Sequence, residues 1–157
     1  MPTVYEGTFA PPPGRFALVA ARFNQFVVEH LVGGAIDGLK RHGVSDEAID
    51  IVWVPGSFEI PLIAKRLAAD GGYAAVICLG AIIRGDTDHY DHVAGEAAKG
   101  VAQAALATGV PVIFGILTCD TLEQAINRAG AKAGNKGFEA ALTAVEMVNL
   151  LGRLPQK

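Results

Sequence analysis

The sequence predicts an α/β protein, a three-layer α/β/α sandwich in which a parallel sheet lies between two layers of helices. Short apolar runs alternate along the chain with longer segments of helical spacing. The runs are apolar at nearly every position, as in parallel strands that are buried on both faces. No repeat or linker interrupts this alternation, so we expect residues 1–157 to form a single domain.

The predicted elements follow a proline-rich break at residues 11–14. Strands are predicted over short, apolar, β-compatible segments, at residues 16–21, 49–54, 73–79 and 112–117. Helices are predicted at residues 26–42, 58–69, 90–107, 120–129 and 138–151. The first helix has the clearest pattern, because its apolar residues recur at helical spacing and its charged residues lie on the opposite face.

Local signals place several helix ends. Gly43 is a plausible end for the first helix, and Pro61 falls in the first turn of the second, where a missing N–H is harmless. Asp120 with Glu123 three residues later has the arrangement of a capping box. A glycine- and lysine-containing break at residues 130–137 precedes the last helix.

Composition excludes some functions. The net charge is −3 with interspersed signs, so nothing indicates binding to nucleic acid or to an acidic membrane. No apolar run approaches the ~18 residues of a membrane span, and the first residues lack the pattern of a signal peptide. Cys78 and Cys119 lie in or at the end of apolar runs, as reduced thiols of a cytoplasmic protein would. We therefore expect a cytoplasmic protein.

Charged residues make up only 18% of the chain, below the roughly 25% of typical globular proteins. The deficit fits either a surface partly covered in an oligomer or simply a core rich in alanine and glycine. A stripe of small residues on the predicted third helix has the same two explanations, packing on the sheet or on another subunit: Ala94, Ala97, Ala98, Val101, Ala102 and Ala105.

Ligands of doubly wound sheets bind beyond the carboxyl ends of the strands, so the residues that follow each strand are the candidate site. Phe23 and Asn24 follow the first strand; they fit a hydrophobic staple and a helix cap, or a stacking face for a planar heterocycle. Ser57, Phe58 and Glu59 follow the second strand, and either capping of the next helix or contact with a polar ligand explains them.

The segment after the third strand is densest in reactive side chains. Asp86 and Thr87 lie in a turn that opens a helix, a backbone geometry suited to phosphate. His89 follows, and histidine is the side chain best suited to transfer protons near neutral pH. The alternatives are a solvated helix cap and a metal site built from Asp86, Asp88, His89 and His92, although their spacing matches no familiar zinc or two-metal motif.

Three cationic residues follow the fourth strand. Arg128 lies near the end of a short helix, where it interacts favourably with the helix dipole, and it could equally bind a phosphate through two hydrogen bonds. Lys132 and Lys136 lie in the glycine-containing break and fit either a solvated loop or an anion site.

Five blocks in order resemble the lumazine synthases, and they span nearly the whole chain. They read ARFN at 21–24, VPGSFEIP at 54–61, GAIIRGDTDHYDHV at 80–93, GVPVIFGILT at 109–118 and LEQAINRAGAKAGNKG at 122–137. The resemblance implies a flavodoxin-like parallel four-stranded sheet, with a short N-terminal strand at residues 4–7 that pairs with a neighbouring subunit. It also implies the condensation of 5-amino-6-(D-ribitylamino)uracil with 3,4-dihydroxy-2-butanone 4-phosphate, without a cofactor or a metal.

The same resemblance implies roles for individual residues. His89 would transfer protons, and Phe23 would stack on the pyrimidine ring with Asn24 beside it. The ring and ribityl chain would be contacted by Ser57, Phe58 and Glu59, the heterocycle by the main chain of Ala81, Ile82 and Ile83, and the phosphate by backbone N–H groups of Asp86 and Thr87. Phe114, Arg128 and Lys136 would reach in from the adjacent subunit.

The implied partners are the two small-molecule substrates and further copies of the chain. Pentamers are expected, and the compact break at residues 130–137 resembles that of members whose pentamers form a sixty-subunit icosahedral shell, which could enclose riboflavin synthase. Two other functions remain open at this point. A metal-dependent phosphatase would use the Asp/His cluster, and a flavin- or lumazine-binding shell would bind without turnover.

Overall fold

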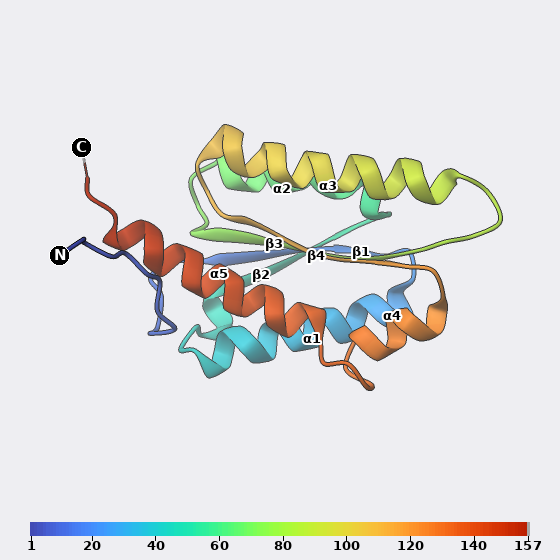
Figure 1. Cartoon of the computed structure of the whole chain (residues 1–157), viewed down its shortest axis with the longest axis horizontal. Helices are drawn as coiled ribbons and strands as arrows, with labels where there is room; N and C mark the ends of the chain where they lie inside the picture. Colours follow the sequence, from blue (N-terminus) through green and yellow to red (C-terminus); the bar gives the residue numbers. More distant parts are fainter. Residues whose placement is uncertain (157) are drawn as a thin grey trace.

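Four parallel strands form the middle layer of the fold, in the order β2-β1-β3-β4 (Figure 1). They are β1 Phe16–Ala21, β2 Ile49–Val54, β3 Ala75–Ile83 and β4 Val112–Cys119. The computed structural model describes residues 1–156. Because the chain winds from β1 out to β2 and then returns to β3 on the other side of β1, the topological switch point lies between β1 and β3.

Helices cover both faces of this sheet, which confirms the predicted three-layer architecture (Figure 1). One face carries α1 Gln25–Arg41, α4 Leu122–Arg128 and α5 Lys136–Arg153. The other carries α2 Ile60–Ala69 and α3 His89–Thr108. None of the helices within residues 1–156 has the length and apolar character needed to cross a bilayer.

The central strand β1 explains the continuous apolar run in the sequence. Phe16 and Leu18 point into the core beneath α1 and α5, whereas Val19 points into the core beneath α2 and α3. All six residues of β1 are buried, so a polar side chain at any of them would face one core or the other. Cys78 in β3 is likewise buried and unpaired, and burial raises the pKa of its thiol to about 12.

Strand β3 differs most from its prediction: it begins two residues later than expected and continues to Ile83. The extension is paired with β4, in the register Gly80↔Ile116 through Ile83↔Cys119, and β4 itself is two residues longer than predicted. Pairing with β1 ends earlier, at Leu79. The last four residues of β3 therefore have a strand neighbour on one side only.

The start of α4 lies one residue later than the sequence suggested. The cap is Thr121, not Asp120, and the Thr121 hydroxyl accepts the Gln124 N–H at 3.1 Å. The Gln124 side chain accepts the Thr121 N–H in return at 3.3 Å, which completes a capping box. The shift follows from the greater length of β4, which ends at Cys119.

Two other helices begin two residues away from their predicted starts, whereas α1 and α3 begin within one residue of theirs. A short 3-10 turn, Ser57–Glu59, precedes α2, which starts at Ile60. Helix α5 starts at Lys136, two residues earlier than expected, because the Asn135 side chain accepts the Phe138 N–H at 3.0 Å and caps it. Lys136 is therefore the first residue of a long helix and not part of a loop.

The N-terminal segment runs along α5 of its own chain (Figure 1). The Asn149 amide donates to the carbonyls of Thr8 and Ala10 at 2.8 and 2.9 Å, and Arg153 donates to the carbonyl of Glu6. Residues 4–7, expected as a strand, form no strand within the described part of this single chain.

Glycine allows the close approach of α5 to α1. A Cβ atom on Gly137 would meet the Leu31 carbonyl, and backbone cannot move aside as a flexible side chain can. Gly137→Ala is therefore expected to destabilise the protein by about 1–3 kcal/mol, the usual cost of overpacking. Gly152→Ala is the matched control in the same helix, because nothing lies near Gly152. Thermal melting should show a lower Tm for the first variant only, and equal Tm values would contradict the packing argument.

Candidate functional site

A cavity of about 570 Å³ opens beyond the carboxyl ends of the strands. It is lined by Phe23, Pro55, Gly56, Ser57, Phe58, Glu59, His89, His92 and Val93. A second cavity, about 70 Å³, shares Phe23, Ser57, His89 and Val93 with it and adds Asn24, Ala81, Ile82, Ile83 and Tyr90. The shared lining makes the two cavities one site, at the switch point where ligands of open α/β sheets bind.

Asn24 joins the ends of two strands and does not cap α1 with its side chain. Its backbone lies in the left-handed region at φ 61°, which asparagine tolerates better than most residues. The Asn24 carbonyl accepts the N–H groups of Val27 and Val28, while its amide donates to the Ala81 carbonyl at 2.8 Å. Asn24 is thus the N-cap residue of α1, as the sequence allowed, but its side chain makes no capping hydrogen bond. The side chain instead fixes the turn after β1 against β3.

Two aromatic rings are exposed at the site. The side chain of Phe23 is 73% exposed and that of Phe58 56% exposed, so Phe23 does not act as the hydrophobic staple that the sequence allowed. Backbone hydrogen bonds from Arg22 to Val54 and from Phe23 to Pro55 hold the ends of β1 and β2 together at 2.7 and 3.0 Å. Exposed rings on a fixed backbone offer a planar ligand a stacking surface.

Ser57 is the buried polar side chain of the site, with only 6% of its surface exposed. Its hydroxyl lies against Gly80 of β3, where a Cβ atom would meet the Ser57 Oγ. Glu59, two residues later, is half-buried and lines the larger cavity. The site therefore combines a buried hydroxyl and a carboxylate with the two aromatic rings.

The end of β3 presents backbone hydrogen-bonding groups to the site. Successive residues of a strand direct their N–H and C=O groups to opposite sides. The N–H of Arg84 donates to Cys119 of β4, whereas the carbonyl of Ala81 accepts from Asn24 on the other side. The N–H and C=O of Ile83 therefore face the same side as those of Ala81, where no strand competes for them.

His89 is the first residue of α3, and its exposed side chain lines both cavities. The backbone N–H of His89 donates to the Thr87 hydroxyl at 3.4 Å. His92 lines the larger cavity one turn later, with its Nε2 3.9 Å from Asp88. The sequence suggested His92 only as a metal ligand, although its three-residue spacing from His89 on a helix places the two on the same face.

The four residues considered as a metal site are not gathered into one. Within residues 1–156, no group of three or more histidine, cysteine, aspartate or glutamate side chains is arranged to hold a metal ion. Asp86 and Thr87 are exposed and line neither cavity. The structure of one chain therefore leaves these two residues outside the site.

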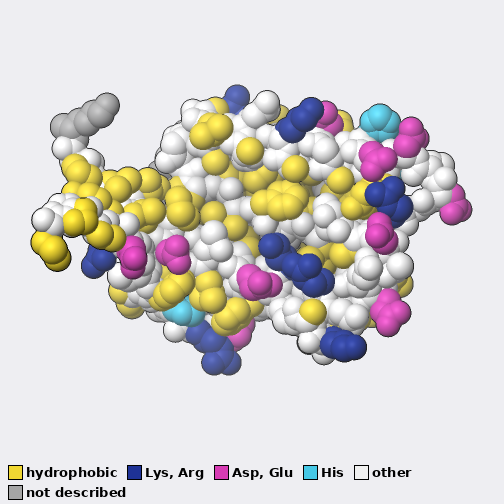
Figure 2. Space-filling model, viewed as in Figure 1, with side chains coloured by type: hydrophobic (Ala, Val, Ile, Leu, Met, Phe, Trp, Pro, Cys, Tyr) yellow, Lys and Arg dark blue, Asp and Glu magenta, His cyan; other side chains and the backbone are white. Residues whose placement is uncertain are grey.

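Arg84 makes several side-chain contacts that hold the segment between β3 and α3. Its guanidinium donates to Asp120 at 3.0 Å, lies 3.7 Å from Asp91 and stacks over the Tyr90 ring at 4.4 Å. The hydrogen bond to Asp120 is the main cause of the raised pKa of Arg84. Figure 2 shows acidic, basic and histidine side chains gathered at the end of the molecule where Figure 1 places this segment.

Three residues that the resemblance assigned to the site lie elsewhere in this chain. Phe114 and Lys136 line a separate cavity of about 450 Å³ beside β4, an edge strand. Hydrophobic side chains form a band across the middle of this face, where β4 runs (Figure 2). Arg128 is exposed at the end of α4, and its charge opposes the rise that burial causes in the pKa of Cys119.

The chain matches the model of a known protein family. The model of the family described as 6,7-dimethyl-8-ribityllumazine synthase matches residues 13–152. The matched range contains all four strands and every residue that lines the cavities described above.

Proposed function

The chain belongs to the 6,7-dimethyl-8-ribityllumazine synthase family, and we propose that the site beyond β1, β2 and β3 is where this transferase of riboflavin biosynthesis binds its substrates. The enzyme condenses 5-amino-6-(D-ribitylamino)uracil with 3,4-dihydroxy-2-butanone 4-phosphate and releases phosphate and water. The observation that carries the proposal is the convergence of Phe23, Ser57 and His89 on both cavities. We further propose that residues 1–157 act as one domain and in the cytoplasm.

The pyrimidine binds between an aromatic ring and the end of β3. Phe23 stacks on the heterocycle, and the backbone groups of Ala81 and Ile83 bond its polar edge; Ile82 contributes to the wall of the pocket. The ribityl chain extends along Ser57, Phe58 and Glu59, where a hydroxyl and a carboxylate can bond its hydroxyl groups. Asn24 holds the turn that carries Phe23.

The reaction requires proton transfers more than bond polarisation by a metal. The amine of the uracil attacks the ketone of the sugar phosphate, and loss of water gives an imine. Loss of a proton from the carbon beside the imine lets phosphate leave, and the enol that results takes up a proton to become a ketone. The second nitrogen attacks this ketone, and loss of a second water closes the ring. His89 relays protons in these steps, and the site contributes further by holding the two substrates together.

The phosphate binds at the start of α3 and to cations of an adjacent copy. The turn at Asp86 and Thr87 precedes the N-terminus of a 20-residue helix, a position where backbone N–H groups favour anions. Arg128 and Lys136 of the neighbour, with Phe114 beside them, complete the site. This arrangement is supported by the cavity that Phe114 of the edge strand β4 and Lys136 of α5 line together, which is separate from the cavities that His89 lines.

Asp86 is expected to contribute little to phosphate binding, because its side chain is exposed and repels the substrate's charge. Asp86→Ala should therefore leave the KM for the sugar phosphate unchanged or slightly lower, since only backbone N–H groups of the turn are used. Steady-state kinetics at fixed uracil concentration measures this. A large increase in KM would give the Asp86 carboxylate a positive role and contradict the proposed contact.

The chain assembles as a homo-oligomer, in our proposal as pentamers that form a sixty-subunit icosahedral shell, with riboflavin synthase as a candidate for its interior. On α3, Ala97 and Val101 pack on the sheet, while Ala98 and Ala102 are exposed and free to meet another copy. Sedimentation velocity separates the pentamer from the shell. Sedimentation as a monomer would contradict both the pentamer and the shell.

The N-terminal residues are proposed to extend a neighbour's sheet at the outer edge of β2, where Ile51 and Trp53 are exposed. Deleting residues 1–8 should reduce the assembly size or the Tm. An unchanged sedimentation coefficient and melting curve would remove this part of the proposal.

A turnover assay tests the function directly. A mixture of purified protein, chelator and the two substrates should form 6,7-dimethyl-8-ribityllumazine faster than the uncatalysed reaction does. The absorbance of this product measures the rate. Loss of the rate with chelator, together with hydrolysis of simple phosphate esters, would favour the metal-dependent phosphatase. Ligand binding without turnover would favour the alternative of a flavin- or lumazine-binding shell without catalytic activity.

A further inference from the structure

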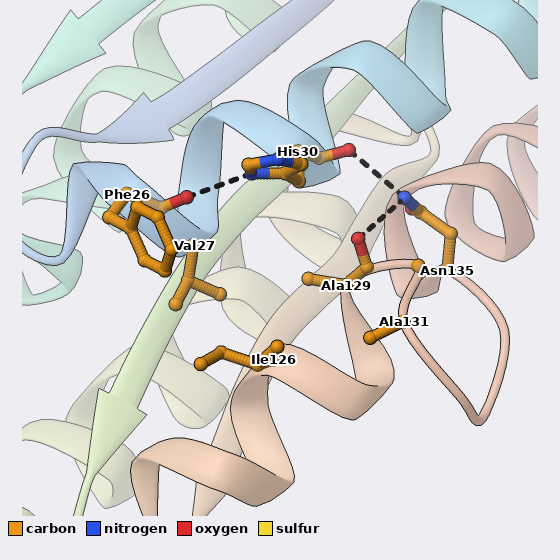
Figure 3. A pocket seen from close by; sticks show the side chains of 8 residues that line it. Phe26, Val27, His30, Ile126, Ala129, Ala131 and Asn135 are labelled. Carbon is orange, nitrogen blue, oxygen red and sulfur yellow. Dashed lines mark hydrogen bonds between the residues drawn. The ribbon is translucent and has the colours of Figure 1, made fainter.

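One side chain, Asn135, joins three separate pieces of backbone, and Figure 3 shows its bonds to two of them. Its Nδ2 donates to the carbonyl of His30 in α1 at 3.0 Å and to the carbonyl of Ala129 at 3.3 Å. Its Oδ1 accepts the N–H of Phe138 in α5 at 3.0 Å. Asn135 thus connects α1, the end of α4 and the start of α5 through one amide group.

The two cations assigned to the phosphate lie directly beside these contacts. Arg128 precedes Ala129, whose carbonyl accepts the amide, and Lys136 follows Asn135 itself. An antiparallel bridge also pairs Ala129 with Asn135, which brings the two ends of the intervening segment together. The position of both cations relative to α1 therefore depends on the backbone that Asn135 holds.

Part of this segment is separated from α1, although Ala129 and Gly137 on either side of it pack closely against that helix. A cavity of about 460 Å³ lies between them, lined by Phe26, Val27, His30, Ile126 and Ala131 among others. The His30 ring bonds the Phe26 carbonyl of its own helix at 2.8 Å and does not cross the gap (Figure 3). Within the view of Figure 3, the Asn135 amide is the group that bonds across it.

Helix α1 leaves room for this amide through a glycine. A Cβ atom on Gly34 would meet the Oδ1 and Cγ of Asn135, whereas a Cβ atom on the preceding Gly33 would meet nothing. The two glycines thus differ only in whether the Asn135 side chain occupies the space beside them.

We propose that Asn135 is a positioning residue that sets the affinity for the phosphate of the sugar substrate, by holding Arg128 and Lys136 in register with each other. The proposal rests on the phosphate role proposed for these two cations. Bidentate recognition of a phosphate by arginine requires a defined approach, so a small displacement of the segment weakens it.

Asn135→Ser tests the proposal without removing the helix cap, because serine also caps α5 but is too short to reach His30. The KM for the sugar phosphate should rise about 10-fold, within the loss that a misplacement of about 1 Å can cause. Inhibition by inorganic phosphate should weaken in proportion. The KM for the uracil, and kcat at saturating sugar phosphate, should remain close to those of the unmodified enzyme.

Gly34→Ala displaces the Asn135 amide without changing Asn135, and Gly33→Ala is its matched control. Both changes replace a helical glycine by a better helix former. Gly34→Ala should reproduce the rise in KM, and Gly33→Ala should not. An unchanged KM in both Asn135→Ser and Gly34→Ala would overturn the proposal. Failure of both variants to assemble would also overturn it, because Asn135 would then maintain the fold and not the site.

Lys136→Ala separates this proposal from the one on which it rests. If Lys136→Ala raises the KM for the sugar phosphate and Asn135→Ser does not, the positioning role fails and the phosphate site stands. If Lys136→Ala itself leaves KM and phosphate inhibition unchanged, the proposed role of Lys136 fails, and the positioning role fails with it.

Discussion

Replacing Arg128 with alanine is expected to raise the KM for 3,4-dihydroxy-2-butanone 4-phosphate by about 10²-fold. Hydrogen bonds to charged groups contribute about 1.5–3 kcal/mol, and one such loss accounts for this factor. Arg128 is exposed at the end of α4, so its removal leaves no hole in the core. Arg128→Lys keeps the charge but loses the bidentate geometry, and its KM should be intermediate.

Lys132→Ala is the matched control for Arg128→Ala. It removes a positive charge from an exposed position four residues away in the same segment. Its KM should remain near that of the unmodified enzyme, which separates a specific contact from the general attraction of a phosphate to positive charge. Equal effects of the two substitutions, or no effect of either, would contradict the role of Arg128.

Replacing His89 with alanine is expected to lower kcat by up to about 10²-fold, the lower end of the range for lost proton transfer. The low end is appropriate because the ring is exposed, and water can carry part of the proton transfer in the variant. The substrate KM values should change less than kcat, since the proposed contacts through Phe23 and the end of β3 remain.

Two other histidines serve as comparisons for His89→Ala. His42 bonds the Gly38 carbonyl at the end of α1, away from the cavities, so His42→Ala should retain full kcat. His92→Ala should reduce kcat less than His89→Ala, because His92 lines only the larger of the two cavities. A kcat for His89→Ala equal to that of the unmodified enzyme would remove histidine from the mechanism.

The layers of the fold could be predicted from local sequence patterns. Strands β1 and β2 have the predicted bounds. For β1 the reason is that a buried parallel strand leaves an uninterrupted apolar run, whereas β2 is an edge strand that contains Asp50 and is only partly buried. The end of β3 could not be predicted in the same way, since Gly80 resembles a strand end and only pairing with β4 extends the strand. The cap of α4 moved to Thr121 for the same nonlocal reason, because the length of β4 decides which cap residue is used.

The sequence predicted that residues after three strands would lie together, and the structure brings them together. The half of the site that we propose a neighbour supplies could not be predicted from sequence patterns, for a physical reason. Phe23, Ser57 and His89 follow three neighbouring strands, and parallel strands end at the same edge of the sheet. The bond from Asn24 to Ala81 joins residues far apart in the chain, so only the folded structure reveals it. Phe114 and Lys136 lie in a separate cavity beside β4, so no pattern within one chain could unite them with His89.

We expect each active site to combine the His89 half of one chain with the Arg128 half of its neighbour. Mixed assembly tests it: His89→Ala and Arg128→Ala chains are dissociated, combined in equal amounts and reassembled. About a quarter of the sites in a randomly mixed closed ring should then carry both groups, and lumazine formation should rise well above the sum of the two separate variants. Turnover no greater than that sum, in properly assembled protein, would place both halves in a single chain and contradict a site shared between neighbours.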